Sequence, residues 1–247
     1  MGSSPRHRAE DVEIYEAQGR TWWTSNRYLV RALRALVKPR MKWFRRAAGS
    51  WSGRRVLDLG CGGGFMSEAI AREGASVVGV DPAVRAIAAA RAHAARQRLK
   101  IRYRVGRAEK IPLPDASVDR VVCVDVLEHV DDLRRCCREI ARVLKPGGVF
   151  LFDTINRTRL SRWIVIGLYE RVLRMAPHGT HDVRKLIRPE ELKRHLKAAG
   201  LVCGSLAGLG PVGFNWRGDP VFAQLPFLAV NYMGIATRRR RRPRRST

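Results

Sequence analysis

Three glycines and a later aspartate are the residues whose types and spacing could do chemistry in this sequence. Gly60-x-Gly62-x-Gly64 follows a short apolar run, and Asp81 stands 21 residues after Gly60. Glycine lets the backbone turn tightly and approach a ligand closely, and the next helix offers unpaired N–H groups to an anionic group. A carboxylate such as that of Asp81 can accept both hydroxyls of a ribose. We therefore predict a nucleoside-bearing ligand here, whereas Asp81 without the glycines would more often cap a helix.

Alternating strands and helices must position these residues. Apolar strands are expected over 56–59, 76–80, 101–105, 119–124 and 149–152, with helices over 65–72, 83–98 and 131–144 between them and a turn over 145–148. Closing strands are expected over 201–206 and 228–235, after a helix over 189–199. Apolar strands joined by single helices predict a parallel sheet covered on both faces. Such a doubly wound sheet binds its ligand at the carboxyl ends of the strands.

The segments outside this pattern define the expected domain organisation. Residues 1–50 form a helical N-terminal segment, and 51–237 form the main domain. A helical insertion is expected over about 156–180, after the fifth strand. The Arg-rich tail, 238–247, is expected to be disordered because blocks of like charge repel one another.

Charge is the unusual feature of the composition. The chain has 48 Lys and Arg against 22 Asp and Glu, a net charge of +26, which attracts nucleic acid and acidic lipid headgroups. Its five cysteines show no C-x-x-C spacing, which argues against a disulfide framework and a zinc site. The sequence has no apolar run long enough to span a membrane, and its first residues lack the apolar core of a signal peptide. We expect a cytoplasmic protein.

The glycine loop alone leaves both NAD and S-adenosylmethionine open as ligands. The segment 108–119, followed by Leu127-Glu128-His129-Val130, resembles the class I methyltransferases. This resemblance implies a Rossmann-like α/β fold with a mostly parallel seven-stranded sheet, and S-adenosylmethionine as the cofactor. It also implies that Glu109 lies near the adenine and that Val124 and Asp125 line the cofactor cleft.

A longer series of motifs resembles one family, the bacterial ubiquinone-biosynthesis O-methyltransferases. The motifs include Trp22-Trp23, Asp125-x-x-Glu128-His129 and Gly179-Thr180-His181-Asp182, the last of which generic methyltransferases lack. The resemblance implies methyl transfer to a phenol or catechol hydroxyl of a polyprenylated quinone precursor. The resemblance and the glycine loop together assign eight residues to cofactor binding. They are Arg40, Asp58, Gly60, Gly62, Gly64, Asp81, Glu109 and Val124.

The resemblance also implies a divalent cation at Asp125, Glu128 and His129. Two carboxylates and an imidazole at positions i, i+3 and i+4 can converge if the segment is one helical turn. Mg²⁺, which prefers oxygen ligands, could then lower the pKa of a bound catechol hydroxyl. The alternative is a helix cap with a hydrogen-bonded histidine. The expected catalytic residues are His129 with Glu128, and then His181 with Asp182, whose carboxylate could equally cap a turn.

The basic segments suggest partners. Residues 156–177 combine arginines with Trp163 and aliphatic residues, as in helices that lie on anionic membranes, and the tail could add to that attraction. The same helix could instead cover the active site. A nucleic-acid methyltransferase is less favoured, because no aromatic residues alternate with the arginines of the tail. Another small phenol remains a candidate substrate. A binding protein without catalytic activity is disfavoured, because the glycines and acids of the site are intact. The sequence leaves the oligomeric state open.

Overall fold

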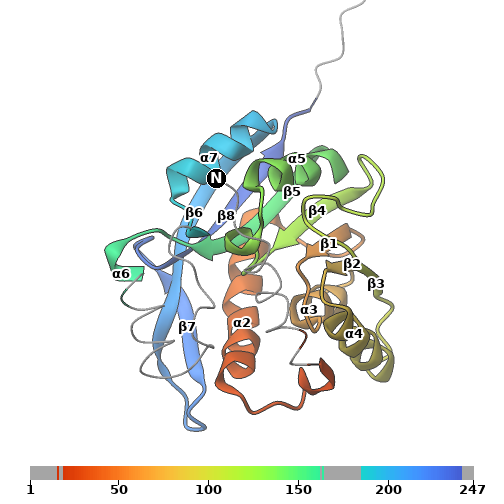
Figure 1. Cartoon of the computed structure of the whole chain (residues 1–247), viewed down its shortest axis with the longest axis vertical. Coiled ribbons are helices and arrows are strands. Elements are labelled where there is room, and N and C mark those ends of the chain that lie inside the picture. Colours follow the sequence, from red (N-terminus) through yellow and green to blue (C-terminus); the bar gives the residue numbers. More distant parts are fainter. Residues whose placement is uncertain (1–15, 17–18, 162, 164–184, 241–247) are drawn as a thin grey trace, which may run out of the picture.

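The computed structural model describes residues 16, 19–161, 163 and 185–240. One sheet of eight strands runs through this part of the chain in the order β3-β2-β1-β4-β5-β8-β6-β7 (Figure 1). The strands are β1 (Arg55–Leu59), β2 (Ser76–Asp81), β3 (Arg102–Val105), β4 (Val118–Cys123), β5 (Leu144–Ile155), β6 (Leu201–Phe214), β7 (Pro220–Leu225) and β8 (Asn231–Arg238). The first five are parallel, whereas β8 is antiparallel to β5 and to β6, and β7 is antiparallel to β6.

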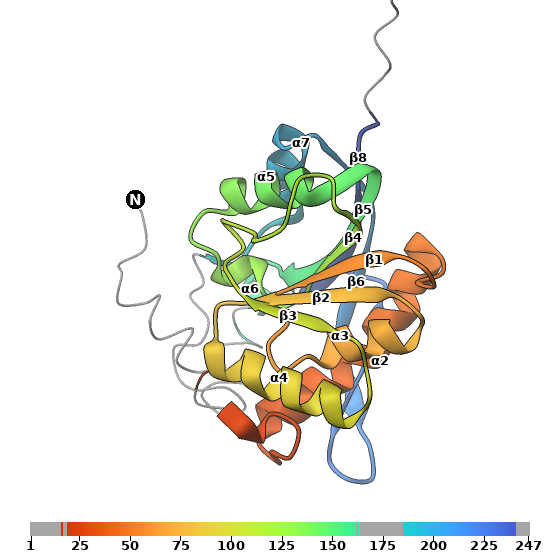
Figure 2. The same ribbon diagram turned by 90° about the vertical axis from the view of Figure 1, so that its right-hand side faces the viewer.

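Helices cover both faces of the sheet. The elements besides the strands are η1 (Gly19–Thr21), α2 (Tyr28–Ala48), α3 (Phe65–Arg72), α4 (Val84–Arg96), η2 (Leu127–His129), α5 (Leu133–Val143), α6 (Arg159–Ser161) and α7 (Pro189–Ala198). Helices α2, α3 and α4 lie on one face, and α5 and α7 lie on the other (Figure 2). The fold class expected from the sequence is therefore confirmed.

Successive residues of the central strands serve opposite layers, because side chains of a strand alternate between the two faces. On β1, Val56 packs with the α2 and α3 side chains, whereas Leu57 and Leu59 pack with the α5 and α7 side chains. Both sets are buried. This explains why β1 reads as a continuous apolar run rather than as an alternating one.

Two expectations need correction. Within the described residues the sheet has eight strands rather than seven, because β6 continues to Phe214 and turns into β7, a hairpin that the alternation pattern did not predict. The expected turn over 145–148 belongs to β5, where the pairing with β4 shifts register between Val118 and Arg120 and Gly147 adopts a φ of 79°. A bulge thus absorbs the glycines within the strand.

A buried arginine of β4 holds the helix that carries Arg40. The Arg120 guanidinium donates to the carbonyl oxygens of Ala48 and Gly49, at 2.5 and 3.2 Å, and lies 4.8 Å from the Trp51 ring centre. Carbonyl groups at a helix C-terminus lack intrahelical partners, and a cation also suits the negative end of the helix dipole. Arg120 therefore fixes the C-terminus of α2 against the sheet.

Most of the expected insertion lies outside the described residues, as do His181, Asp182 and the tail beyond Arg240. What is described of the insertion is its start, including α6 and Trp163, whose side chain is 77% exposed. Among the described helices, none has the length and apolarity that crossing a bilayer requires.

Candidate active site

The glycine loop joins β1 to α3 at the carboxyl end of the sheet. Gly60 has a φ of 74°, in the left-handed region that favours glycine. A Cβ at Gly60 would lie 2.1 Å from Cγ2 of Val126, so the loop packs directly on the segment after β4. Gly64, which we expected to bind the cofactor, precedes α3 as its N-cap residue, and a Cβ there would meet the Tyr103 hydroxyl.

Asp81, the last residue of β2, holds this loop in place. Its Oδ2 accepts a hydrogen bond from the Gly62 amide and its Oδ1 one from the Ala83 amide, both at 2.8 Å. Burial raises the pKa of Asp81 to about 6, against the lowering by these amides. A carboxylate oxygen has two lone pairs, so each oxygen of Asp81 retains one acceptor position for a ligand hydroxyl.

Asp58 contributes a buried acceptor beside the loop. Its Oδ2 accepts a hydrogen bond from the Ser67 hydroxyl at 2.5 Å, while Oδ1 is buried with no donor among the described residues. Desolvation raises the pKa of Asp58 to about 6. Because an unpaired buried acceptor is costly, Asp58 suits a ligand that supplies a donor, such as the ammonium group of an amino acid.

A cavity of about 150 Å³ lies among these residues. Of the expected cofactor residues, its lining includes Arg40, Asp58, Gly60, Gly62, Asp81, Glu109 and Val124. It does not include Gly64. The lining also contains Asp125 and His129, so the loop after β4 closes the cavity on the side opposite β2. The cavity, the glycine loop, Asp81 and the unpaired Asp58 oxygen together fit an adenosine that carries an amino acid.

An aromatic lid that we did not assign to the site covers the glycine loop. The Trp22 ring packs against the loop, where a Cβ at Gly63 would lie 2.7 Å from it. Trp23 donates from Nε1 to the Gly63 carbonyl at 2.9 Å and stacks on His93 with ring centres 3.5 Å apart. The adjacent tryptophans were visible in the sequence, but only their contacts with the loop reveal that Trp22 lines the cavity.

Arg40 lies at the base of the cavity and is 2% exposed. Its guanidinium contacts two carboxylates, Asp153 at 2.5 Å and Asp125 at 2.6 Å. Asp153 also accepts a hydrogen bond from the Asp125 amide at 2.9 Å, and Asp125 has a left-handed φ of 54°. We did not assign Asp153 to the site. A signal for it was available, since it is an acid at the end of an apolar strand.

The expected metal ligands do not converge. Asp125 pairs with Arg40, whereas Glu128 is buried and accepts a hydrogen bond from the Thr154 hydroxyl at 2.8 Å. Burial raises the pKa of Glu128, which disfavours the charged form that binds a metal. No three His, Cys, Asp or Glu side chains in the described part of the chain are arranged to hold a metal ion. The arrangement of Asp125, Glu128 and His129 therefore does not fit a metal, and Glu128 does not line the cavity.

Comparison with known proteins places this geometry in context. The family model of a methyltransferase domain matches residues 57–152, from β1 to β5. A ubiquinone biosynthesis O-methyltransferase of Bordetella avium is 37% identical over 96% of this chain and 97% of its own length. Relatives of the same name from a Chelativorans species, at 36% identity, and Acinetobacter baumannii, at 37%, cover 92% and 91% of this chain, and 92% and 93% of their own lengths.

Solved structures support the fold. A possible histamine N-methyltransferase from Thermotoga maritima superposes with a TM-score of 0.64 at 19% identity, over 93% of this chain and all of its own. The magnesium protoporphyrin IX methyltransferase of Synechocystis, solved with bound S-adenosylhomocysteine, gives a TM-score of 0.62 at 17% identity, over 85% of each chain.

Proposed function

Because the chain belongs to the family of ubiquinone biosynthesis O-methyltransferases and is an S-adenosylmethionine-dependent O-methyltransferase, we propose that it methylates a catechol hydroxyl of a polyprenylated quinone precursor. The cavity at the carboxyl end of the sheet, with Asp81 holding the glycine loop, carries this proposal. In the proposed complex, Asp81 binds the ribose hydroxyls of S-adenosylmethionine and Glu109 lies beside its adenine. Asp58 and Arg40 bind the ammonium and carboxylate of the methionine part.

The proposed reaction is a direct methyl transfer. The substrate oxygen attacks the methyl carbon of the sulfonium in line, the carbon–sulfur bond breaks, and S-adenosylhomocysteine leaves with the electron pair. His129, which lines the cavity and is half-buried, accepts the phenolic proton. Orientation of two bound reactants contributes most, about 7–11 kcal/mol, whereas a general base adds about 10²–10⁴-fold. No step of this reaction uses a metal.

A catechol assay tests the reaction. We expect the purified chain to transfer a labelled methyl group to short-chain polyprenyl catechols, and His129→Gln to lower kcat by about 10²–10⁴-fold with an unchanged affinity for S-adenosylmethionine. EDTA should leave the rate unchanged; a loss that Mg²⁺ restores would reinstate Asp125, Glu128 and His129 as ligands. Transfer to RNA but to no catechol would overturn the proposed function. Transfer only to other small phenols would overturn the proposed substrate and leave the O-methyltransferase activity in place.

A polyprenylated substrate resides in the bilayer, so we also propose that the enzyme works at an anionic membrane surface, cytoplasmic and peripheral. Residues 156–177 and the tail 238–247 would make the contact. The exposed Trp163 supports this proposal, as does the net charge of +26, because tryptophan favours the headgroup layer and each basic residue near an anionic surface adds about 1 kcal/mol.

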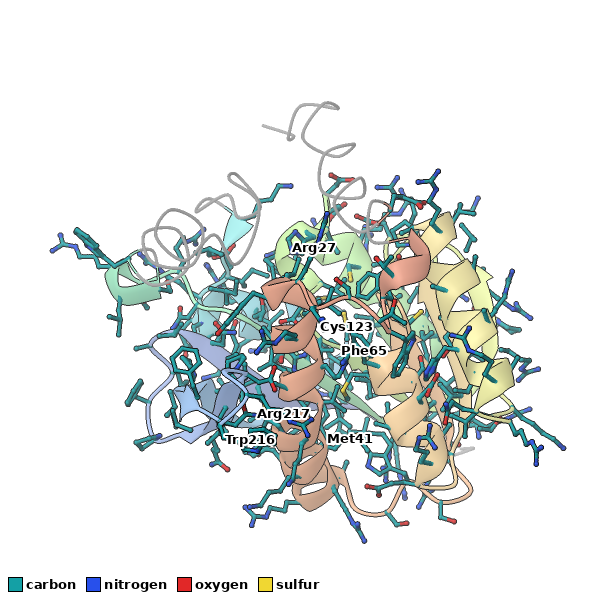
Figure 3. All side chains as sticks on the ribbon, turned by 90° about the horizontal axis from the view of Figure 1, so that it is seen from below. Arg27, Met41, Phe65, Cys123, Trp216 and Arg217 are labelled. Atoms are coloured by element: carbon teal, nitrogen blue, oxygen red, sulfur yellow. The ribbon has the colours of Figure 1, made fainter. Side chains whose placement is uncertain are left out.

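Vesicle flotation tests the membrane contact. Trp163→Glu should weaken binding to vesicles that contain phosphatidylglycerol, because it places a charge in the proposed contact. Trp216→Glu is the matched control: Trp216 is 86% exposed at the β6–β7 turn, beside Arg217 (Figure 3). The control should float like the wild type. Equal binding by all three proteins would remove residues 156–177 from the contact.

A further inference from the structure

The buried carboxylate of Asp153 lies behind the cavity and is not used in the proposed reaction. Its side chain is 1% exposed, and its two oxygens accept hydrogen bonds from two elements. Oδ2 accepts from Nε of Arg40 on α2, and Oδ1 accepts from the Asp125 amide after β4. Burial raises the pKa of Asp153 to about 7, although Arg40 and the Asp125 amide lower it, so the carboxylate is ionised at pH 8. Asp153 therefore fixes both Arg40 and the backbone of Asp125.

The charges around the cavity have the opposite sign to the charge of the chain. The lining holds four carboxylates (Asp58, Asp81, Glu109 and Asp125) against two guanidinium groups (Arg40 and Arg107), in a protein of net charge +26. Asp153 adds a further carboxylate directly behind Arg40. With Asp125 and Asp153 both in contact, the charge of Arg40 is more than compensated.

This balance matters because the cofactor changes charge during the reaction. S-adenosylmethionine carries a sulfonium cation, and S-adenosylhomocysteine carries a neutral thioether, while both share the same ribose, ammonium and carboxylate. A surplus of negative charge fixed in a low-dielectric site favours the cation selectively. An uncompensated Arg40 would have the opposite effect on the sulfonium.

We propose that Asp153 is a specificity-determining residue, which compensates Arg40 and so raises the affinity of the cavity for the cationic cofactor relative to its affinity for the neutral product. It acts through Arg40 and Asp125 rather than by touching either ligand. The proposal rests on the proposed cofactor site.

The ratio of two dissociation constants tests this proposal. Calorimetry at about pH 8 would measure the binding of S-adenosylmethionine and S-adenosylhomocysteine to the whole chain. In Asp153→Asn, the dissociation constant of S-adenosylhomocysteine divided by that of S-adenosylmethionine should fall about tenfold. One unit charge acting over several ångströms inside a protein has an effect of that order. In Arg40→Gln the same ratio should rise, even though the protein binds both ligands more weakly. A role confined to packing would not shift the two ratios in opposite directions.

Asp119→Asn is the control. Asp119 also accepts from a backbone amide, that of Arg55, and from a cation, Lys145, but at the opposite end of β4. Its substitution should leave the ratio unchanged. Asp153→Ser provides a second neutral variant if Asp153→Asn does not fold, as judged by its thermal transition. A wild type that binds neither ligand would refute the proposed cofactor site, whereas normal binding with an unchanged ratio in both neutral variants would overturn this proposal alone.

Discussion

Replacement of Asp81 by alanine is expected to weaken binding of S-adenosylhomocysteine by about 10²–10⁴-fold. Two hydrogen bonds from ribose hydroxyls to a carboxylate contribute about 3–6 kcal/mol together. The variant also frees the Gly62 and Ala83 amides, which now hold the loop against Asp81. Isothermal titration calorimetry measures the loss.

The control for Asp81 must separate ribose binding from helix capping. Asp132 is the N-cap of α5 and accepts a hydrogen bond from the Arg135 amide at 2.8 Å, but it does not line the cavity. Asp132→Ala should reduce the free energy of unfolding by about 1 kcal/mol and leave cofactor affinity unchanged. If Asp81→Ala behaved like Asp132→Ala, Asp81 would be a cap and not a ligand.

A Cβ at Gly60 is expected to disable the site and to destabilise the fold. In Gly60→Ala, a left-handed φ costs about 1–2 kcal/mol, and the collision with Val126 adds about 1–3 kcal/mol of overpacking. The loop or the Val126 segment must move, and both line the cavity. We expect cofactor binding to be lost and the free energy of unfolding to fall by about 2–5 kcal/mol, as measured by calorimetry and urea denaturation.

Two further variants divide this cost. Gly53 has a φ of 70°, and no atom lies within 4 Å of the place that a Cβ would take there, so Gly53→Ala should show the backbone cost alone and retain cofactor binding. Gly60→Ala combined with Val126→Ala should recover part of the stability, because the nearest atom to the new Cβ, Cγ2 of Val126, is removed. A double variant as unstable as Gly60→Ala would show that the collision does not determine the loss.

The parts of the fold that the sequence predicts are those governed by local pattern. The five parallel strands and the helices between them follow from apolar runs and from turn residues. The β6–β7 hairpin was not predicted, because Gly208–Phe227 is rich in glycine and proline and its apolar and polar residues do not clearly alternate. Its position depends on long-range contacts instead, including the ion pair of Arg31 on α2 with Asp219 at 2.5 Å.

The site shows the same division. The loop and Asp81 belong to one strand–helix–strand unit, so their spacing alone predicts that they meet, and the structure brings them together. The triad of Arg40, Asp125 and Asp153 joins three segments that are far apart in the sequence. Nothing local in the motif around Asp125 indicates that its carboxylate pairs with an arginine of α2. The sequence therefore suggested a metal ion as the partner of Asp125, whereas the structure places Arg40 there.

The position of β8 has a consequence for biosynthesis. Of the described strands it comes last in the sequence, yet it lies inside the sheet and pairs with β5 on one side and β6 on the other. Until residues 231–238 have left the ribosome, the inner edges of β5 and β6 have no partner, and unpaired edges invite association with other chains. A nascent chain would therefore expose these edges to other chains, although every residue that lines the cavity has already been synthesised.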